Sequence, residues 1–130
     1  MHDLKSTLTY KWFQEVWNEG REDLIDDLMS QKSIIHGIAE GQSKGAEGFK
    51  FFYRNFKAQF RDIRVDIQEA LSQDNLECAL TNVTATHKET GTKVSFSGLC
   101  MVRFEEGKIA EAWNHYDFLS MHQQLGRVLA

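Results

Sequence analysis

Hydrophobic residues recur at helical spacing in the first half of the chain. Over residues 8–17, large apolar side chains fall three or four positions apart, which predicts a helix that ends near Gly20. Residues 24–29 predict a short second helix, and a brief strand follows over 33–36. A glycine-rich loop then leads into a third helix over about 46–60, with an aromatic stripe for the core and a basic stripe for solvent.

From residue 63 the spacing changes, and apolar residues alternate with polar ones as in a half-buried strand. Further strands are predicted over about 76–88, 93–105 and 108–118, joined by short glycine-containing hairpin loops. Three helices followed by these strands predict an α+β fold, in which the helices cover one face of a curved antiparallel sheet. A length of 130 residues predicts one domain over residues 1–130.

The hairpin loops at Gly91 and Gly107 allow the register of the last three strands to be predicted. Two-residue loops place a mostly apolar row, which includes Phe96 and Trp113, on the face toward the helices, provided that no bulge interrupts the strands. The outer face then carries several leucines, a methionine and Tyr116 among polar residues. This mixture is too apolar for a solvated surface, and it predicts a homodimer through the outer sheet face.

Three titratable residues, His87, His115 and Asp117, gather at one end of the apolar row in this register. Such groups are costly on a dry core face unless they are paired or hydrated. Gly98 lies opposite His115 and leaves space there. We therefore expect a cavity between sheet and helices, apolar at its base and polar at its mouth, for a small apolar or mixed-polarity organic ligand.

Charge and composition exclude several other classes of function. With 15 Lys and Arg against 19 Asp and Glu, the net charge is −4, so the chain lacks the basic surface of a nucleic-acid-binding protein. No apolar run is long enough to span a membrane, and the first residues show no signal-peptide pattern, so we expect a cytoplasmic location. No cofactor motif is present. His87, His115 and Asp117 could share a metal ion, but without a tight ligand motif we predict no metal site.

A set of short motifs between residues 12 and 126 occurs in an order that is typical of one family. The motifs are Trp17-Asn18-Glu19-Gly20, His36-Gly37, Gly45-Ala46-Glu47-Gly48, Phe60-Arg61-Asp62, Thr86-His87, Gly107-Lys108-Ile109, Glu111-Ala112-Trp113, Asp117 and Gln124-Leu125-Gly126. In this order the sequence resembles the SnoaL-like polyketide cyclases and related ester cyclases of the NTF2-like superfamily.

The resemblance implies a cone-shaped sheet whose mouth is closed by three N-terminal helices, a deep ligand pocket and a dimer. Characterised members close a ring by intramolecular aldol condensation without a metal or a cofactor. By the same resemblance Asp117 matches the general acid/base, His87 matches a histidine of the cavity and His36 matches a pocket-side position. The hairpin after His87 is shorter here than in the cyclases, so the polycyclic substrate is not carried over.

Two functions stay open at this point. In the first, the protein is a cofactor-independent cyclase, isomerase or lyase, in which Asp117 and His87 act on a small apolar carbonyl compound. In the second, it is a noncatalytic ligand-binding or dimerisation module, and Asp117 caps the helix that follows its strand. The expected ligand-binding residues are His36, Phe56, Phe96, Trp113 and His115.

Overall fold

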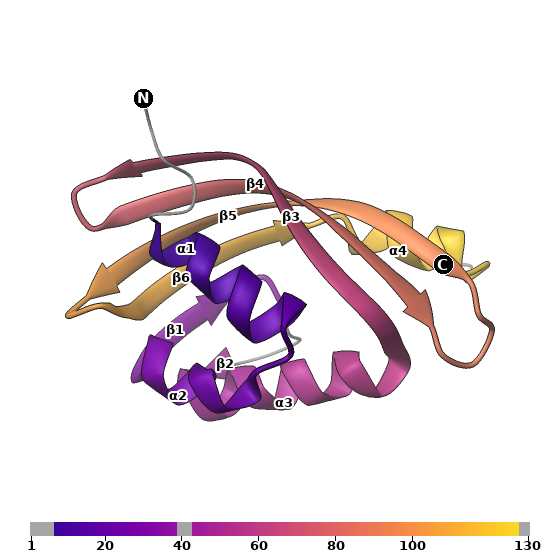
Figure 1. The fold of residues 1–130 in the computed structure, drawn as a ribbon, viewed down its shortest axis with the longest axis horizontal. Helices are drawn as coiled ribbons and strands as arrows, with labels where there is room; N and C mark the ends of the chain where they lie inside the picture. The colour runs from indigo at the N-terminus through magenta and orange to yellow at the C-terminus, as the bar shows by residue number, and fades with distance from the viewer. Residues whose placement is uncertain (1–6, 39–42, 128–130) are drawn as a thin grey trace.

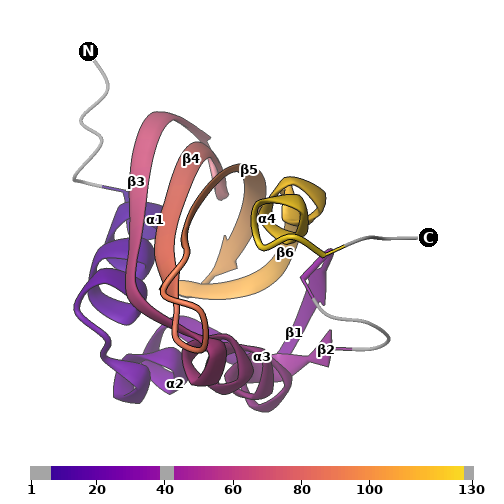
Figure 2. The same ribbon diagram turned by 90° about the vertical axis from the view of Figure 1, so that its right-hand side faces the viewer.

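The computed structural model describes residues 7–38 and 43–127. Helices pack beneath the concave face of a curved sheet, as Figures 1 and 2 show. In chain order the elements are α1 (Leu8–Lys11), η2 (Trp12–Asn18), η3 (Glu22–Leu24), α2 (Ile25–Leu28), β1 (Met29–His36), β2 (Ser43–Lys44), α3 (Gly45–Gln59), β3 (Phe60–Gln73), β4 (Leu76–His87), β5 (Lys93–Glu105), β6 (Lys108–Tyr116) and α4 (Phe118–Gln124). None of the described helices is long and apolar enough to cross a lipid bilayer.

The strands of the described residues form one six-stranded sheet in the order β2-β1-β6-β5-β4-β3. Neighbouring strands are antiparallel, except that β1 lies parallel to β6. In Figure 2 the long strands β3 to β6 curl around the helical side of the molecule. The expected α+β fold with a curved, mainly antiparallel sheet is therefore confirmed, and the parallel pairing of β1 extends it.

The first helix predicted from the sequence is divided into the α-helix α1 and the π-helix η2. The wider π turn brings residues five positions apart, such as Trp12 and Trp17, to the same side of the helix, and both line the cavity described below. Asn18, at the end of η2, fastens this helix to β3: its side chain accepts the N–H of Val65 at 2.7 Å and donates to the Val65 carbonyl at 2.9 Å.

The loop between β4 and β5 is longer than the two residues expected. The N–H of His87 donates to the Thr92 carbonyl at 2.8 Å, and the ladder begins only where Thr86 pairs with Lys93. Partners in β5 are consequently two residues away from the expected ones. A shift of two positions leaves each side chain on its expected face of the sheet, because side chains alternate with a period of two.

The β5–β6 hairpin begins in the expected register, where Glu105 pairs with Lys108. The register then shifts by one position, so that Arg103 pairs with Glu111 and Ala110 is an extra residue in β6. This irregularity is a β-bulge, and it reverses the facing of every later side chain in the strand. The face predicted for the second half of β6 is therefore wrong.

The bulge has a direct consequence for the candidate site. Asn114 and Tyr116 line the inner cavity, whereas Trp113 and His115 do not. Tyr116, which we expected on the outer face, thus faces inward, and Trp113 and His115, which we expected inside, face outward. The sheet adopts this arrangement because Ala112, a buried residue, follows the buried Ile109 by three positions, a spacing that a regular strand cannot place on one face.

Candidate functional site

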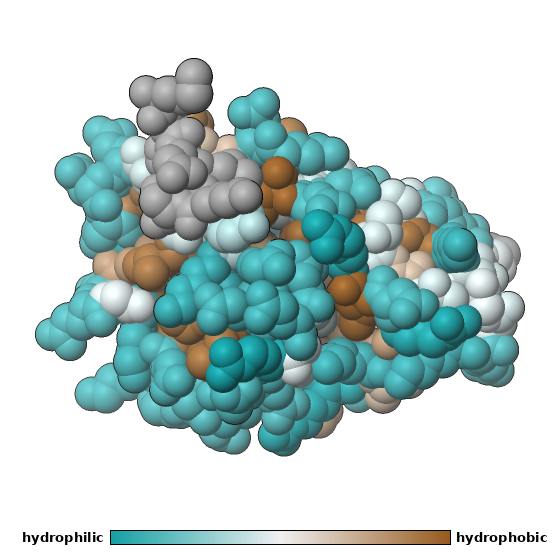
Figure 3. Space-filling view, viewed as in Figure 1, coloured by the Kyte–Doolittle hydropathy of each residue, from teal (hydrophilic) through white to brown (hydrophobic). Residues whose placement is uncertain are grey.

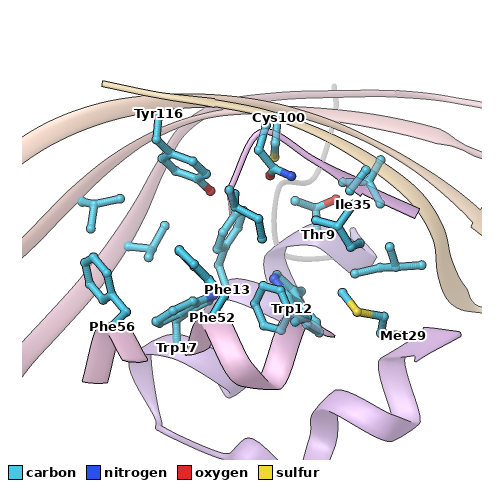
Figure 4. A pocket seen from close by; sticks show the side chains of 18 of the residues that line it. Thr9, Trp12, Phe13, Trp17, Met29, Ile35, Phe52, Phe56, Cys100 and Tyr116 are labelled. Carbon is cyan, nitrogen blue, oxygen red and sulfur yellow. The ribbon is translucent and has the colours of Figure 1, made fainter. Parts of the chain in front are cut away.

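A cavity of about 70 Å³ lies between the inner face of the sheet and the helices, and Figure 4 shows side chains from both layers turned toward it. Most of its wall is apolar, and ten of the lining residues are aromatic. Three rings come from η2 and three from α3: Trp12, Phe13, Trp17, Phe49, Phe52 and Phe56. Phe96 of β5 also lines the cavity. The structure therefore places two expected ligand contacts, Phe56 and Phe96, at the cavity.

The aromatic wall on the helical side is tightly packed around Trp17. Its ring lies 4.7 Å from the ring of Tyr53, 5.8 Å from Phe56 and 6.1 Å from Phe49, between ring centroids. Edge-to-face and tilted contacts of this kind are the favoured geometries of aromatic pairs. The Tyr53 hydroxyl also donates to the Val16 carbonyl at 2.7 Å, which ties α3 to η2. These contacts make the aromatic wall a rigid surface.

Tyr116 supplies a hydroxyl to the sheet side of the cavity, where Figure 4 shows it pointing toward the helices. Its ring crosses Gly98, and a Cβ atom built on Gly98 would overlap that ring. The space that we expected beside Gly98 is thus filled by Tyr116. Burial raises the pKa of the Tyr116 hydroxyl, and a hydrogen bond with Thr81 acts in the opposite direction. The hydroxyl is therefore uncharged at neutral pH and acts as a hydrogen-bonding group.

Cys100 and Asn114 add two more neutral groups to the cavity. Burial raises the pKa of the Cys100 thiol to about 12, so the thiol is protonated and unreactive at neutral pH. The Asn114 amide donates from Nδ2 to the His36 carbonyl at 3.0 Å. Among the described residues that line the cavity there is no carboxylate, imidazole or cationic side chain. The cavity is thus suited to an uncharged ligand.

Asp117 lies at the end of β6 and is exposed to solvent. Its carboxylate accepts the N–H of Ser120 at 3.0 Å and forms the N-cap of α4. Its own N–H donates to the Ser97 carbonyl at 2.9 Å. The expected position on the inner face is wrong, because of the bulge, and the structure agrees with the alternative interpretation of Asp117 as a helix cap. Its catalytic role stays a prediction.

His87 lies at the end of β4 and is 7% exposed. Its Nδ1 is 2.9 Å from the Thr90 hydroxyl, within the β4–β5 loop. The His87 ring is 5.3 Å from the ring of Phe60, which in turn stacks on Phe56 at 4.6 Å. His87 is not among the described residues that line the cavity, and this row of rings connects it to the cavity.

The remaining predicted ligand contacts, His36, Trp113 and His115, do not line the cavity. His36 stacks on Trp113 with ring centroids 5.7 Å apart, and its Nε2 lies 2.8 Å from a carboxylate oxygen of Glu111. Hydrogen bonds from His36 and then Arg103 lower the pKa of Glu111. Within the described parts of the chain no three His, Cys, Asp or Glu side chains are grouped so that they could hold a metal ion.

Sequence reasoning missed Thr9, Asn114 and Tyr116 as cavity residues. The signal that could have found the last two is the three-residue spacing of Ile109 and Ala112, which favours a bulge in an otherwise alternating strand. Thr9 gave no such signal, because a threonine within an apolar helical pattern is equally consistent with a solvent-facing position.

Comparisons with known proteins agree with the fold. The model of the SnoaL-like polyketide cyclase family matches residues 7–125. A candidate polyketide cyclase of Bacillus cereus is 28% identical with a TM-score of 0.83, over 94% of this chain and 80% of that one. One from Acidithiobacillus ferrooxidans is 26% identical with a TM-score of 0.82, over 96% and 98%.

A third solved structure shares the fold at lower sequence identity. AclR, a candidate hydroxylase of Streptomyces galilaeus, is 22% identical with a TM-score of 0.78, over 95% of this chain and 85% of that one. This likeness concerns the fold alone. Comparison with curated proteins gives no match.

Proposed function

We propose, since the chain belongs to the SnoaL-like polyketide cyclase family, that it binds a small, uncharged and largely apolar organic molecule in the cavity beneath the sheet. The observation that supports this proposal is the composition of the cavity wall, which among the described residues is aromatic and aliphatic with a few neutral polar groups. A charged ligand would lose its hydration there without gaining an opposite charge, which is unfavourable.

Binding is better supported than conversion of the ligand. Removal of a proton next to a carbonyl requires a base within hydrogen-bond reach. The titratable side chains in the described cavity wall are Cys100 and Tyr116, and burial raises the pKa of both, so neither accepts a proton at neutral pH. Asp117 stands in the chain between two cavity-lining residues, Tyr116 and Phe118. Conversion of a carbonyl compound by Asp117 with His87 is therefore our second candidate.

Binding can be tested with two small probes, acetophenone and ethylbenzene, which share an aromatic ring and differ in a carbonyl oxygen. We expect both to change the tryptophan fluorescence of the protein, because Trp12 and Trp17 line the cavity. Ala112→Leu, which extends a buried cavity residue, should weaken both probes at least about tenfold. Ala70→Leu in β3, at a partly exposed site outside the cavity wall, is the matched control.

Circular dichroism of both variants shows whether they fold. If Ala112→Leu does not fold, Cys100→Met is a second variant that fills the same cavity. Failure of the wild-type protein to bind either probe would contradict the proposal. Equal binding by the wild type and a folded cavity-filling variant would contradict the location of the site.

We also propose that two copies of the chain associate through the outer sheet face. Leu99 pairs with Leu80 of β4 and lies next to Met101, and all three are exposed. An apolar patch of this kind on a monomer is typical of an interface. Sedimentation velocity at micromolar concentration should show a dimer, and Leu99→Glu should produce monomers. Leu119→Glu in α4, where the side chain is equally exposed at 53%, should not. A wild-type monomer would contradict the proposal.

A further inference from the structure

Thr9 carries a buried hydroxyl that is unsatisfied in the described structure. The residue is 2% exposed and lines the cavity, yet its hydroxyl has no hydrogen-bond partner among the described residues. Figure 4 shows Thr9 among the side chains that surround the cavity. A buried hydroxyl without a partner destabilises the folded protein, and valine, which has nearly the same shape, would avoid that loss.

The other polar side chains on the sheet side of the cavity already have partners. Tyr116 hydrogen-bonds with Thr81, and Asn114 donates to the His36 carbonyl. Thr9 is the second residue of α1, and its hydroxyl has no partner among the described residues. Its donor and its acceptor positions are therefore both available to a molecule in the cavity.

The position of Thr9 is fixed by contacts with the sheet. Glu77 of β4 accepts the N–H of Thr9 at 2.8 Å and the N–H of Leu8 at 3.3 Å. Thr7 caps the same helix by accepting the N–H of Tyr10 at 3.0 Å. The first helical turn is therefore held against β4, and the backbone position of Thr9 is set before any ligand arrives. A position that is set in advance reduces the entropy that binding would otherwise lose.

We infer that the Thr9 hydroxyl is a specificity contact, which hydrogen-bonds a carbonyl or hydroxyl oxygen of the ligand. This inference rests on the proposed function. It narrows the ligand class to uncharged molecules whose apolar body carries such an oxygen at the end that faces α1. An apolar molecule of equal size without an oxygen leaves the hydroxyl unpaired and binds more weakly.

The test compares Thr9→Val, which removes the hydroxyl and keeps the shape, with Thr9→Ser, which keeps the hydroxyl. Wild-type protein should bind acetophenone more tightly than ethylbenzene. Thr9→Val should lose that preference through a decrease of about tenfold in acetophenone affinity, the size expected for one hydrogen bond. Ethylbenzene affinity should not change. Thr9→Ser should retain the preference for acetophenone.

A second measurement separates a ligand contact from a structural role. Thr9→Val should melt at the same temperature as the ligand-free wild type or higher, because it removes an unpaired buried hydroxyl. A lower melting temperature with weaker binding of both probes would mean that the hydroxyl supports the fold, and would overturn the inference. So would an unchanged acetophenone affinity in Thr9→Val, or a wild type without preference, while the proposed function would stand. Only the absence of binding of either probe by the wild type contradicts the proposed function itself.

Discussion

The two faces of β6 differ sharply beyond the bulge. Its inner residues, Asn114 and Tyr116, are neutral and border the cavity. On the other face, a carboxylate oxygen of Glu111 lies 2.8 Å from His36 Nε2, and Glu111 forms an ion pair with Arg103 at 3.4 Å. A single extra residue thus separates the groups that can carry charge from the space that can hold a ligand. The difference teaches that the proposed ligand would be recognised by shape and by uncharged hydrogen bonds.

A hydrogen bond contributes differently to stability on the two faces of β6. The outer pairs are partly exposed to solvent, and ion pairs at the surface contribute little to stability. In the cavity the surroundings are apolar, so a hydrogen bond that is made is stronger and one that is missing costs more. On the inner face, the Tyr116 ring occupies its position only because Gly98 has no side chain.

The largest effect on stability is expected from Gly98→Ala, which disturbs the packing on the inner face of the sheet. The new Cβ would overlap the Tyr116 ring and force it out of its position. We expect the free energy of unfolding to decrease by about 1–3 kcal/mol, as in other overpacked cores. Chemical denaturation measures this loss.

A double-mutant comparison identifies the cause of that loss. In a Tyr116→Ala background the ring is absent, so the cost of Gly98→Ala should be much smaller than in the wild type. An equal cost in both backgrounds would show that the overlap with Tyr116 is not the reason for glycine at this position.

An intermediate effect is expected where β6 ends. Asp117→Ala removes the N-cap of α4 and should lower the free energy of unfolding by about 1 kcal/mol, whereas Asp117→Asn, which still caps, should change it little. Neither variant should alter acetophenone affinity. Weaker probe binding by Asp117→Asn, with unchanged stability, would instead place the carboxylate at the ligand and favour the catalytic alternative.

The smallest effect is expected on the outer face. Hydrogen bonds with His36 and Arg103 lower the pKa of Glu111 in the folded protein. The stabilisation from these bonds is therefore present above the pKa of an unfolded glutamate and is lost as the pH falls through the lowered value. A carbon-13 titration of the Glu111 carboxyl should give a higher midpoint in His36→Gln than in the wild type. Identical midpoints would contradict the contribution of His36.

The sequence was sufficient for most of the fold because the fold depends on periodicity. The helix predicted over about 46–60 is α3, Gly45–Gln59, and its aromatic stripe faces the core as expected. The three long strands from residue 76 onward also agree closely with β4, β5 and β6. Helical and alternating patterns report burial, and burial is what assembles these layers.

The candidate site could be predicted only in part, since it depends on which of the two alternating faces of a strand each side chain occupies. The longer β4–β5 loop moved partners by two positions and kept Phe96 inside, whereas the bulge at Ala110 moved β6 by one and turned His115 outward. A bulge adds one residue without any strong sequence signal. The hydroxyl of Thr9 was equally hidden, because its lack of a partner is a property of the packed structure.

The side chain of Asn18 has a consequence beyond holding η2 in place. β3 is the last strand of the sheet, and the amide of Asn18 occupies both main-chain groups of Val65 in the way that an adjoining strand would. The exposed backbone of an edge strand can pair with other chains and so promotes aggregation. Because Asn18 occupies the N–H and the carbonyl of Val65, this part of β3 is unavailable to such pairing, which opposes aggregation.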